Sequence, residues 1–471
     1  MAGWDAHHHN RQHTAGVRRW QGTFVALLLL TSSASTAFAQ NYSFDARRIG
    51  LGGAGGTPNV ASKLVEQERR YKSVLIPVGM VKMLSDVHVF YPNREDFDFS
   101  RAVEYSSSPF HFVFGRQKDI TVGSFFRDLV HAQLNSDLNT YRQPRDPSDS
   151  PMVTTADGLM DVTWGKEFNL RQDEHSFQRI YVGAGPYYGS RAYANFDADL
   201  EQVLSSSTNR YIPSATLGIG GGETSQLALD ITGAYRARFP IFGEDGPGAR
   251  RDGMYIAANY HHLQGLRLDR FQANLQLQTD TNGLLVPDPP TTPFRLGWDA
   301  TSGHGVGLSL DFGVSFVINR WDFGAGVTGL ANRINWSDIL HRDLSLVNLQ
   351  NGVDFVYLKL PRTKETLHLE MPTTYTADFA YHWDTYSLYS EYSNGLGGVN
   401  FRTGLEYTGW KRIELRGAGR YSQGSWYPAA GVGVNLTRTF GVDAGLYGTK
   451  TFLETEPHLG MALSFRWDKR E

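Results

Sequence analysis

From His304 to Phe316 the chain reads HGVGLSLDFGVSF, in which every second residue from Val306 onward is apolar and the residues between them are small or charged. Successive side chains of a β-strand point to opposite faces, so this period of two predicts a strand with one apolar and one polar face. The same alternation recurs in residues 180–184, 227–235, 254–260, 271–277, 321–327, 375–383, 401–407, 413–421, 430–436, 440–446 and 459–467.

The links between these segments alternate in length. Some are only a few residues long, such as Thr408–Lys411 and Thr437–Thr439, and links this short can join only antiparallel neighbours. Longer links rich in Pro, Gly and Asp are expected to be surface loops. These longer links are residues 142–151, 240–252, 283–293 and 337–366. The pattern predicts an all-β, antiparallel transmembrane β-barrel.

The polar face of the predicted strands is strongly charged, so the apolar face is the one expected to meet membrane lipid. An arginine facing lipid at the membrane midplane costs about 2–4 kcal/mol. We therefore expect Leu308→Arg and Val432→Arg to impair folding and Gly433→Ser to be tolerated. The charges are expected to pair across strands inside the lumen, with a substrate site as the alternative. The lumen-facing candidates are Asp311, Asp322, Asp378, Arg402, Glu406, Glu414, Arg416, Arg420, Asp443 and Arg466.

Composition excludes several other classes of protein. The chain has 471 residues with 50 glycines, 13 % aromatic and 20 % charged residues, which argues against disorder. A mean hydropathy of −0.36, without any run of about 18 apolar residues, argues against a bundle of membrane-spanning helices. The absence of cysteine excludes disulfides and thiolate metal sites, and a net charge of −3 gives no polycationic surface for nucleic acid.

The first residues predict export from the cytoplasm. Arg18 and Arg19 precede the apolar run 24–30, and Ala37-Phe38-Ala39 forms a cleavage site, as in a secretory signal peptide. We therefore divide the chain into a signal peptide at 1–39, a plug segment at 40–72, a barrel at 73–467 and a tail at 468–471. About 14 strands fit the barrel, at roughly 25–30 residues per strand and link. The expected location is the outer membrane of a Gram-negative bacterium.

The plug segment differs from the rest because strand alternation begins only near Ser73. Its glycine-rich part contains Gly50, Gly52, Gly53 and Gly55, and residues 60–72 have the pattern of a short charged helix. Glycine permits the close backbone packing that a segment inside a barrel needs. We expect the helix to contact the lumen charges Glu414, Arg416 and Arg420 through Glu66, Glu68, Arg69 and Arg70.

Motifs for catalysis or cofactors are weak. Two matches to the dinucleotide fingerprint, at 50–55 and 324–329, lack the strand–turn–helix context, and no Walker loop or H-E-x-x-H motif occurs. His261 and His262 point to opposite faces if they lie on a strand, so the pair is not expected to share one metal ion. An enzyme at the lumen rim is an alternative whose histidines would come from His111, His131, His304, His382 and His458. We predict no enzyme activity, no cofactor and no metal.

Both ends of the chain resemble a known family. Asp45-Ala-Arg-Arg-Ile-Gly-Leu-Gly-Gly-Ala-Gly55 is similar to the start of mature FadL-like outer-membrane proteins, and Gly404–Tyr407, Leu415–Gly417, Gly431–Val434 and Leu463–Phe465 are similar to their C-terminal strands. This superfamily includes fatty-acid transporters, TraF-like barrels and PorV-like barrels. The chain departs from it in two places. Thr57-Pro-Asn-Val-Ala61 stands where an Asn-Pro-Ala hatch motif is usual, and four residues follow the terminal aromatic Trp467.

The resemblance implies a barrel with a plugged lumen that passes or binds small hydrophobic molecules of the fatty-acid type. The alternative is a PorV-like barrel that docks a secreted or periplasmic protein. The expected partners are outer-membrane lipid and a hydrophobic small molecule or such a protein, but not nucleic acid. An apolar pocket would favour transport, and a lumen filled by charged pairs would favour docking.

Overall fold

The computed structural model describes residues 45–55, 59–67, 71–85, 112–114, 154–161, 163–173, 175–196, 213–214, 216–241, 252–282, 294–348, 354–359, 366–396, 398–422, 424–449 and 458–468. The predicted signal peptide and the predicted loops at 142–151 and 283–293 lie outside these residues. No helix in the described part of the chain is long and apolar enough to cross a membrane.

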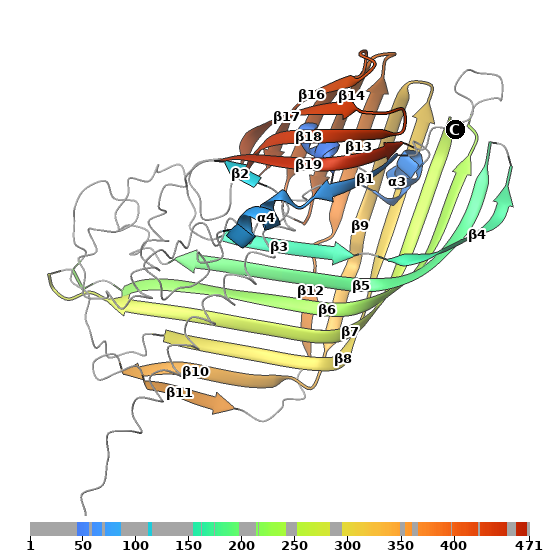
Figure 1. Cartoon of the computed structure of the whole chain (residues 1–471). Coiled ribbons are helices and arrows are strands. Elements are labelled where there is room, and N and C mark those ends of the chain that lie inside the picture. Colours follow the sequence, from blue (N-terminus) through green and yellow to red (C-terminus); the bar gives the residue numbers. More distant parts are fainter. Residues whose placement is uncertain are drawn as a thin grey trace, which may run out of the picture.

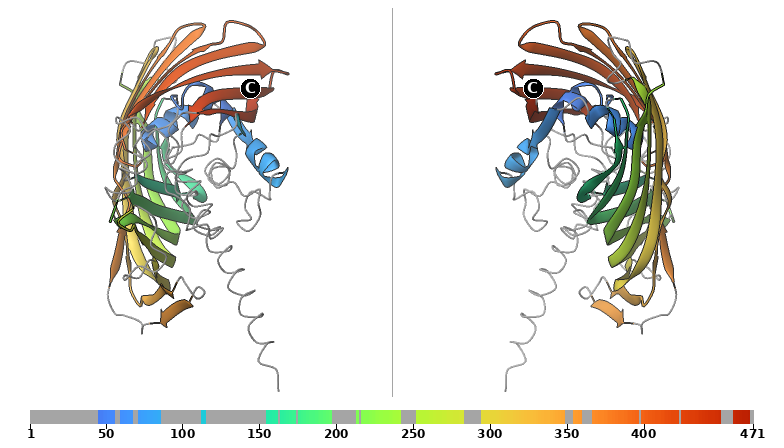
Figure 2. Two further views of the ribbon diagram at one scale, coloured as in Figure 1. Left: turned by 90° about the vertical axis from the view of Figure 1, so that its left-hand side faces the viewer. Right: turned by 90° about the vertical axis from the view of Figure 1, so that its right-hand side faces the viewer.

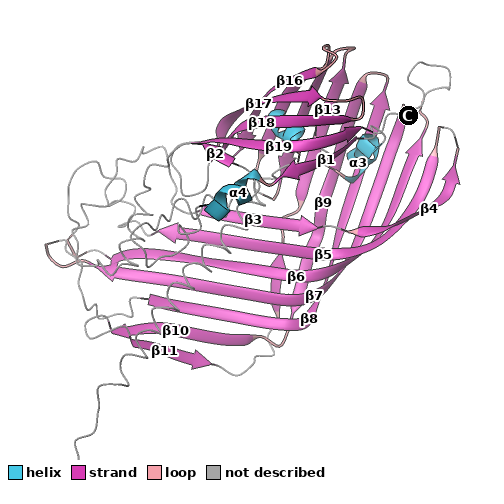
Figure 3. Cartoon of the chain, viewed as in Figure 1, coloured by secondary structure: helices cyan, strands magenta, loops and turns pink. Residues whose placement is uncertain are grey.

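The described residues form one sheet of 19 strands with three short helices, and the recorded pairings between strands are antiparallel (Figures 1 and 3). The predicted all-β antiparallel fold class is therefore confirmed. The strands are β1 (Tyr71–Ile76), β2 (Phe112–Phe114), β3 (Thr154–Asp161), β4 (Trp164–Gln172), β5 (Phe177–Phe196), β6 (Thr216–Phe239), β7 (Gly253–Gln278), β8 (Phe294–Ile318), β9 (Trp321–Trp336), β10 (Leu340–Asn348), β11 (Asp354–Lys359), β12 (Leu367–Glu370), β13 (Thr374–His382), β14 (Tyr386–Asn394), β15 (Asn400–Tyr407), β16 (Ile413–Ser422), β17 (Ser425–Asn435), β18 (Phe440–Thr449) and β19 (His458–Asp468). The helices are α2 (Ala46–Gly50), α3 (Val60–Gln67) and α4 (Val78–Ser85).

The pairings give the order of the strands across the sheet. Neighbours follow the chain from β5 to β9 and from β13 to β19, and β9 pairs with β13. Both β3 and β4 pair with β5, while β1 and β2 both pair with β19. Likewise, β10 pairs with β8 beyond the end of β9, so β10 continues the position of β9 in the sheet. In the same way, β12 pairs with β9 and β11 pairs with β10, so both continue the position of β13. Five of the 19 described segments (β2, β4, β10, β11 and β12) thus continue another one, which leaves 14 strand positions side by side.

The sheet is strongly curved, and α2 and α3 lie on its concave side (Figure 2). Its two edges are formed by β1 and β2 on one side and by β3 and β4 on the other. No pairing between these edges is recorded within the described ranges. The described part is therefore an open curved shell of the barrel type.

The two faces of the sheet are inverted relative to a soluble protein. In β15, Leu405 is 44 % exposed, whereas its neighbour Glu406 is 2 % exposed. In β16, Leu415 is 40 % exposed, whereas Arg416 is 5 % exposed. Burying charges is costly unless they are paired, and exposing a row of large apolar side chains to water is unfavourable. The alternation in the sequence thus places charge on the concave face and apolar side chains on the convex face.

Three expectations from the sequence are wrong in detail. Residues 337–366 are not one surface loop, because β10 and β11 within them form a hairpin whose first strand pairs with β8. The segments 254–260 and 271–277 belong to the single strand β7, which changes register between Gly265 and Arg267. Strand structure begins at Tyr71, close to the expected start near Ser73, but the helix α4 follows at once where only barrel strands were expected.

Candidate functional site: the concave face and the segment that covers it

Residues 45–55 and 59–67, which we call the N-terminal segment, cover two separate areas of the concave face. Helix α2 contacts β17, β18 and β19, and helix α3 contacts β7, β8 and β9. Figure 1 shows both helices against the inside of the curved sheet. The glycine-rich turn after α2 therefore leads from the helix that lies on the C-terminal strands towards the helix that lies on the central strands.

Helix α2 rests directly on the backbone of two strands. A Cβ added to Gly50 would lie 2.7 Å from the Cα of Gly431 in β17, and a Cβ added to Gly445 in β18 would lie 2.6 Å from the carbonyl oxygen of Ala46. Side chains do not fit at such distances. Glycine at these positions is thus required for the helix to approach the sheet this closely.

The turn that follows α2 uses the other three glycines predicted for the plug. Gly52, Gly53 and Gly55 have positive φ angles of 66°, 88° and 67°, a conformation that favours glycine. A Cβ on Gly53 would lie 3.2 Å from the Arg402 side chain, and a Cβ on Gly55 would lie 3.0 Å from the Tyr389 ring. The turn therefore packs against side chains of the concave face.

Beneath α2 lies a network of buried charges centred on Arg416. The side chain of Arg416 is 0 % exposed, and its guanidinium bonds to the carboxylates of Glu406 at 2.8 Å, Glu414 at 2.5 Å and Asp443 at 2.7 Å. Arg47 of α2 donates to both carboxylate oxygens of Glu406, at 2.8 and 2.5 Å. A buried charge that loses its partner costs about 3–5 kcal/mol, so these pairs depend on one another.

The remaining C-terminal charges surround this network. Arg466 donates to both oxygens of Glu414 at 2.7 and 3.0 Å. Arg402 pairs with Glu391 at 2.7 Å. Arg420 is placed differently, with its guanidinium over the Tyr427 ring and its Nη2 3.5 Å from the carbonyl oxygen of Gly448. The predicted contacts of the helix at 60–72 with Glu414, Arg416 and Arg420 differ from the structure, because α3 packs on β7, β8 and β9, while Arg47 of α2 pairs with Glu406. The side chains of Glu66, Glu68, Arg69 and Arg70 lie outside the described residues.

Helix α3 is held by Asn59. In the sequence analysis this residue appears only as part of Thr57–Ala61, the stretch that stands where the hatch motif is usual. The Asn59 side-chain oxygen accepts the N–H groups of Ala61 and Ser62, both at 2.9 Å, and so caps the helix. Its amide donates to Asp378 at 2.9 Å, and the Ser62 hydroxyl donates to the same carboxylate at 2.8 Å. Asp378 is thus the acceptor that fixes the start of α3 to β13.

Glycines of the central strands also make room for this cap. A Cβ on Gly313 in β8 would lie 2.5 Å from the Asn59 side-chain oxygen, and a Cβ on Gly326 in β9 would lie 2.5 Å from the Asn59 Cβ. The apolar side of α3 packs on the same strands in a cluster of buried residues. This cluster contains Val60, Ala61, Leu64, Val65, Phe177, Tyr255, Ala257 and Val317.

A cavity of about 310 Å³ lies beside α3. Apolar side chains on its wall include Val60, Leu64, Leu159 and Leu263. Polar side chains occupy the rest of the lining, among them Asp161, Lys63, Arg236, Asn259, His261 and Asp311. Sequence reasoning considered His261 only as a pair with His262 and did not find this cavity. No local signal could have revealed it, because its walls come from α3 and from strands separated by more than 100 residues.

The histidines considered for a rim enzyme are not gathered at one place. His111 and His131 lie outside the described residues, as does the side chain of His458. His304 lies 3.6 Å from Asp338 in an exposed pair. His382 has a more organised environment, with Nδ1 3.0 Å from the Ser387 hydroxyl and Nε2 3.2 Å from Asp322. A serine, a histidine and an aspartate are the residue types of a nucleophilic triad. Ser387, however, is also the residue directly opposite His382 in the β13–β14 ladder, so the two are ordinary cross-strand neighbours.

Comparisons with known proteins give solved structures only. No family model matches the sequence, and no curated protein matches it. Among solved structures, a FadL homologue of Pseudomonas aeruginosa matches with 12 % identity and a TM-score of 0.32, covering 76 % of this chain and 100 % of that chain. The Ralstonia pickettii toluene transporter TbuX matches with 11 % identity and a TM-score of 0.31, covering 62 % and 80 %. The Pseudomonas putida toluene transporter TodX matches with 10 % identity and a TM-score of 0.30, covering 67 % and 87 %.

The outer-membrane phospholipase A of Escherichia coli also matches, with 9 % identity and a TM-score of 0.21, covering 51 % of this chain and 81 % of that chain. The structures found thus include the family that the sequence resembles.

Proposed function

We propose that this chain is an outer-membrane β-barrel that passes small hydrophobic molecules and that its N-terminal segment controls the passage. The observation that carries this proposal is the docking of that segment on the concave, charged face, while the large apolar side chains face outward. An apolar outer face suits a lipid environment, and a charged inner face suits a lumen.

The two ends of the segment have different roles in this proposal. Helix α2 is the anchor, because its glycine contacts and the Arg47–Glu406 pair leave little space beneath it. Helix α3 is the gate, because the cavity lies against it and the Asn59 cap supplies polar contacts that can be broken and remade. A cavity of about 310 Å³ is at the lower end of the range for small-molecule sites, so the transported molecule would be small.

The lining of the two areas bears on the alternative of protein docking. Charged pairs fill the area beneath α2, which is the property that favours docking. The cavity beside α3 has a mixed wall, in which Val60, Leu64, Leu159 and Leu263 form an apolar part beside polar side chains, and this apolar part favours a hydrophobic ligand. Transport is the better-supported function because, among the described residues, the space beside α3 (about 310 Å³) is much larger than the pocket of about 20 Å³ beside α2.

The test is to release the N-terminal segment without changing the barrel wall. Gly50→Val places a side chain against the Gly431 backbone and should displace α2, whereas Gly417→Val is a matched control because a Cβ on Gly417 meets nothing within 4 Å. We expect cells producing Gly50→Val to take up a hydrophobic dye faster than cells producing wild type or Gly417→Val. Deletion of residues 44–56 should act in the same direction.

Correct insertion of each variant is checked by its different migration in gels with and without boiling. Unchanged dye uptake by a correctly inserted Gly50→Val variant and by the deletion would contradict gating. Copurification of a periplasmic protein with wild type, lost in these variants, would then favour the docking function.

A further inference from the structure

A cluster of ionisable side chains lies on the central strands, at the wall of the cavity beside α3. Its centre is His261 on β7, flanked by Asp230 on β6 and Asp311 on β8, with Asp161 at the end of β3. The imidazole Nδ1 lies 2.8 Å from Asp230 and 3.5 Å from Asp161, and Nε2 lies 3.0 Å from Asp311. Acidic side chains from β3, β6 and β8 thus surround the imidazole of one histidine.

The charge of this cluster is unbalanced. Three carboxylates surround a single imidazole, so the group stays negative even when His261 is protonated. Within the described residues, the ion pairs recorded for these carboxylates are those with His261. Two cations line the same cavity: the Arg236 guanidinium pairs with Glu167, and Lys63 of α3 forms no recorded ion pair with the three carboxylates in the described part of the chain. Asp230 and Asp311 are buried, whereas Asp161 is exposed. Buried carboxylates are usually paired or bound to a metal ion, so two of them against one imidazole indicate a missing cation.

Asp230 provides a second, independent observation. Its side chain is 0 % exposed, and one of its oxygens, Oδ2, accepts from the Thr232 hydroxyl at 2.6 Å and lies against His261. The other oxygen, Oδ1, is buried and has no hydrogen-bond partner in the part of the chain that the structure describes. An orphaned carboxylate oxygen of this kind is costly, because a charged acceptor has lost its water without replacement.

The positions of the atoms fit a metal ion. One ligand atom from each of Asp161, Asp230 and His261 lies within 4.8 Å of the other two. Asp311 stands on the opposite side of the imidazole and is itself held by the N–H of Gly329 at 2.9 Å and the amide of Asn259 at 3.2 Å. A carboxylate that accepts from the second ring nitrogen leaves the first nitrogen free to bind a metal, which is the usual arrangement around metal-bound histidine.

We propose that Asp161, Asp230 and His261 bind one divalent transition-metal ion of the Zn²⁺ class and that Asp311 orients the His261 ring. One imidazole and two carboxylates are a mixed nitrogen and oxygen set, which suits Zn²⁺ better than Mg²⁺ or Ca²⁺. Three protein ligands leave a fourth position for water. The adjacent cavity, lined by Asp161 and His261, provides space for that water.

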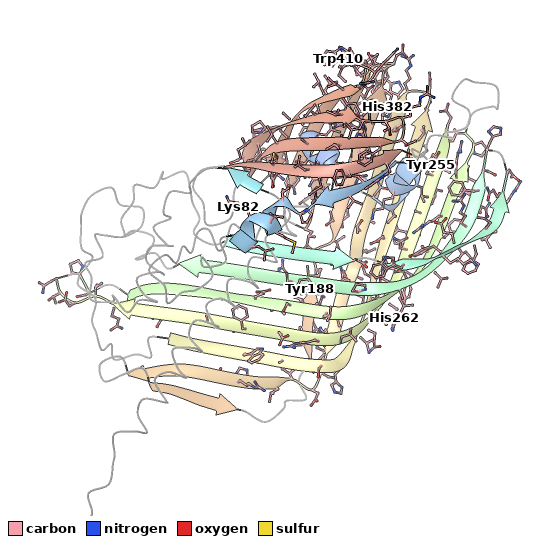
Figure 4. The ribbon with its side chains drawn as sticks, viewed as in Figure 1. Lys82, Tyr188, Tyr255, His262, His382 and Trp410 are labelled. Carbon is pink, nitrogen blue, oxygen red and sulfur yellow. The ribbon has the colours of Figure 1, made fainter. Side chains whose placement is uncertain are left out.

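The neighbouring histidine provides the matched control. His262 follows His261 on β7, and because adjacent strand residues point to opposite faces, its ring lies on the convex side (Figure 4). His262→Gln removes one histidine from the chain, as His261→Gln does, but leaves the cluster intact. Any Zn²⁺ bound by histidines elsewhere in the chain is therefore equal in the two variants.

The experiment measures Zn²⁺ bound by the full chain, purified in detergent and stripped with a chelator, using calorimetry and elemental analysis. Wild type and His262→Gln should bind one more equivalent of Zn²⁺ than His261→Gln and Asp161→Asn. Asp311→Asn should keep the site but weaken Zn²⁺ affinity about 10–100-fold, as expected for a residue that only positions a ligand. Mg²⁺ at the same concentration should not compete.

Asp161 is the most exposed member of the cluster, so Asp161→Asn is the variant that should fold even when replacement of buried His261 or Asp230 prevents assembly. Equal Zn²⁺ stoichiometry and affinity in wild type, Asp161→Asn and His262→Gln would overturn the proposal. Equal binding of Mg²⁺ and Zn²⁺ would overturn the role given to the imidazole. Neither result depends on whether the barrel passes hydrophobic molecules, because dye uptake is not measured.

Discussion

Arg416 and Asp443 form an ion pair of 2.7 Å in which neither side chain is exposed to solvent. The two residues lie on β16 and β18, separated by β17, so their contact crosses a whole strand of the concave face. Gly431 and Gly433 on β17 leave the space through which the Arg416 side chain reaches, since a Cβ on Gly433 would lie 2.6 Å from Asp443 and 2.9 Å from Arg416.

The first prediction is that Arg416→Met prevents stable assembly of the C-terminal strands. The substitution leaves the buried carboxylates of Glu406, Glu414 and Asp443 close together without their shared partner. Loss of one partner from a buried pair costs about 3–5 kcal/mol. The measurement is the temperature at which the folded band disappears from a gel of unboiled samples. Arg412→Met, at an exposed position nearby, is the control and should behave as wild type.

The second prediction concerns the outward face. Leu308 is 40 % exposed on β8, and Leu308→Arg should reduce the yield of inserted protein because an arginine facing lipid costs about 2–4 kcal/mol. Leu308→Met keeps an apolar side chain and is the control. Equal yields of the two variants in the membrane fraction would contradict the assignment of the convex face to lipid.

The expectation that Gly433→Ser is tolerated needs revision for a structural reason. Alternation alone places Gly433 on the charged face, where a small polar side chain looks harmless. In the structure a Cβ there would lie 3.0 Å or less from atoms of Asp443, Arg416 and Glu414. These atoms are held in the buried network and cannot move apart cheaply. We therefore expect Gly433→Ser to lower thermal stability in the same gel assay, in the direction of Arg416→Met.

Many of the strands, such as β8, β9 and β15 to β19, could be predicted from the sequence because each of these carries its own signal. The alternation in 304–316 reports which face each side chain occupies, and that is a local property. The β10–β11 hairpin was missed because Leu340–Leu346 pairs with Phe294–Ala300 at the far end of β8. A stretch rich in charge forms a strand there because a long neighbouring strand offers its edge, and local composition does not report this.

Contacts between distant segments were predicted less well. The sequence assigned the lumen charges to the helix at 60–72, but Arg47 of α2 makes the contact with Glu406. The reason is that α2 can approach only where Gly50 meets Gly431 and Gly445, and this match joins residues about 380 positions apart. The His261 cluster was invisible for the same reason, since its carboxylates come from β3, β6 and β8.

The third prediction concerns the cap of α3. Asn59→Asp keeps an oxygen that can cap the helix but places a second carboxylate against Asp378, which lies 2.9 Å from the Asn59 amide. Repulsion between the two should release α3 from the sheet. Trypsin should then cleave after Lys63, an exposed residue of α3 that we expect to be protected while the helix is docked.

The double variant Asn59→Asp with Asp378→Asn restores a donor opposite the new carboxylate and should regain protection of Lys63. Asp378→Asn alone retains an oxygen that accepts from Asn59 and Ser62, so it should remain protected. If Asn59→Asp is cleaved no faster than wild type, the contact with Asp378 does not hold the helix.

The fourth prediction is that Ser387 does not act as a nucleophile, despite its contact with His382, whose other ring nitrogen lies against Asp322. Ser387 lies within β14, opposite His382 on β13 and opposite Glu406 on β15, in ladders without a register shift. In such a strand the backbone N–H groups are used by the neighbouring strands, so none is available to stabilise an oxyanion. A fluorophosphonate probe should therefore label wild type and Ser387→Ala to the same background level. Labelling of wild type that Ser387→Ala and His382→Gln both abolish would instead identify a hydrolase site at this position.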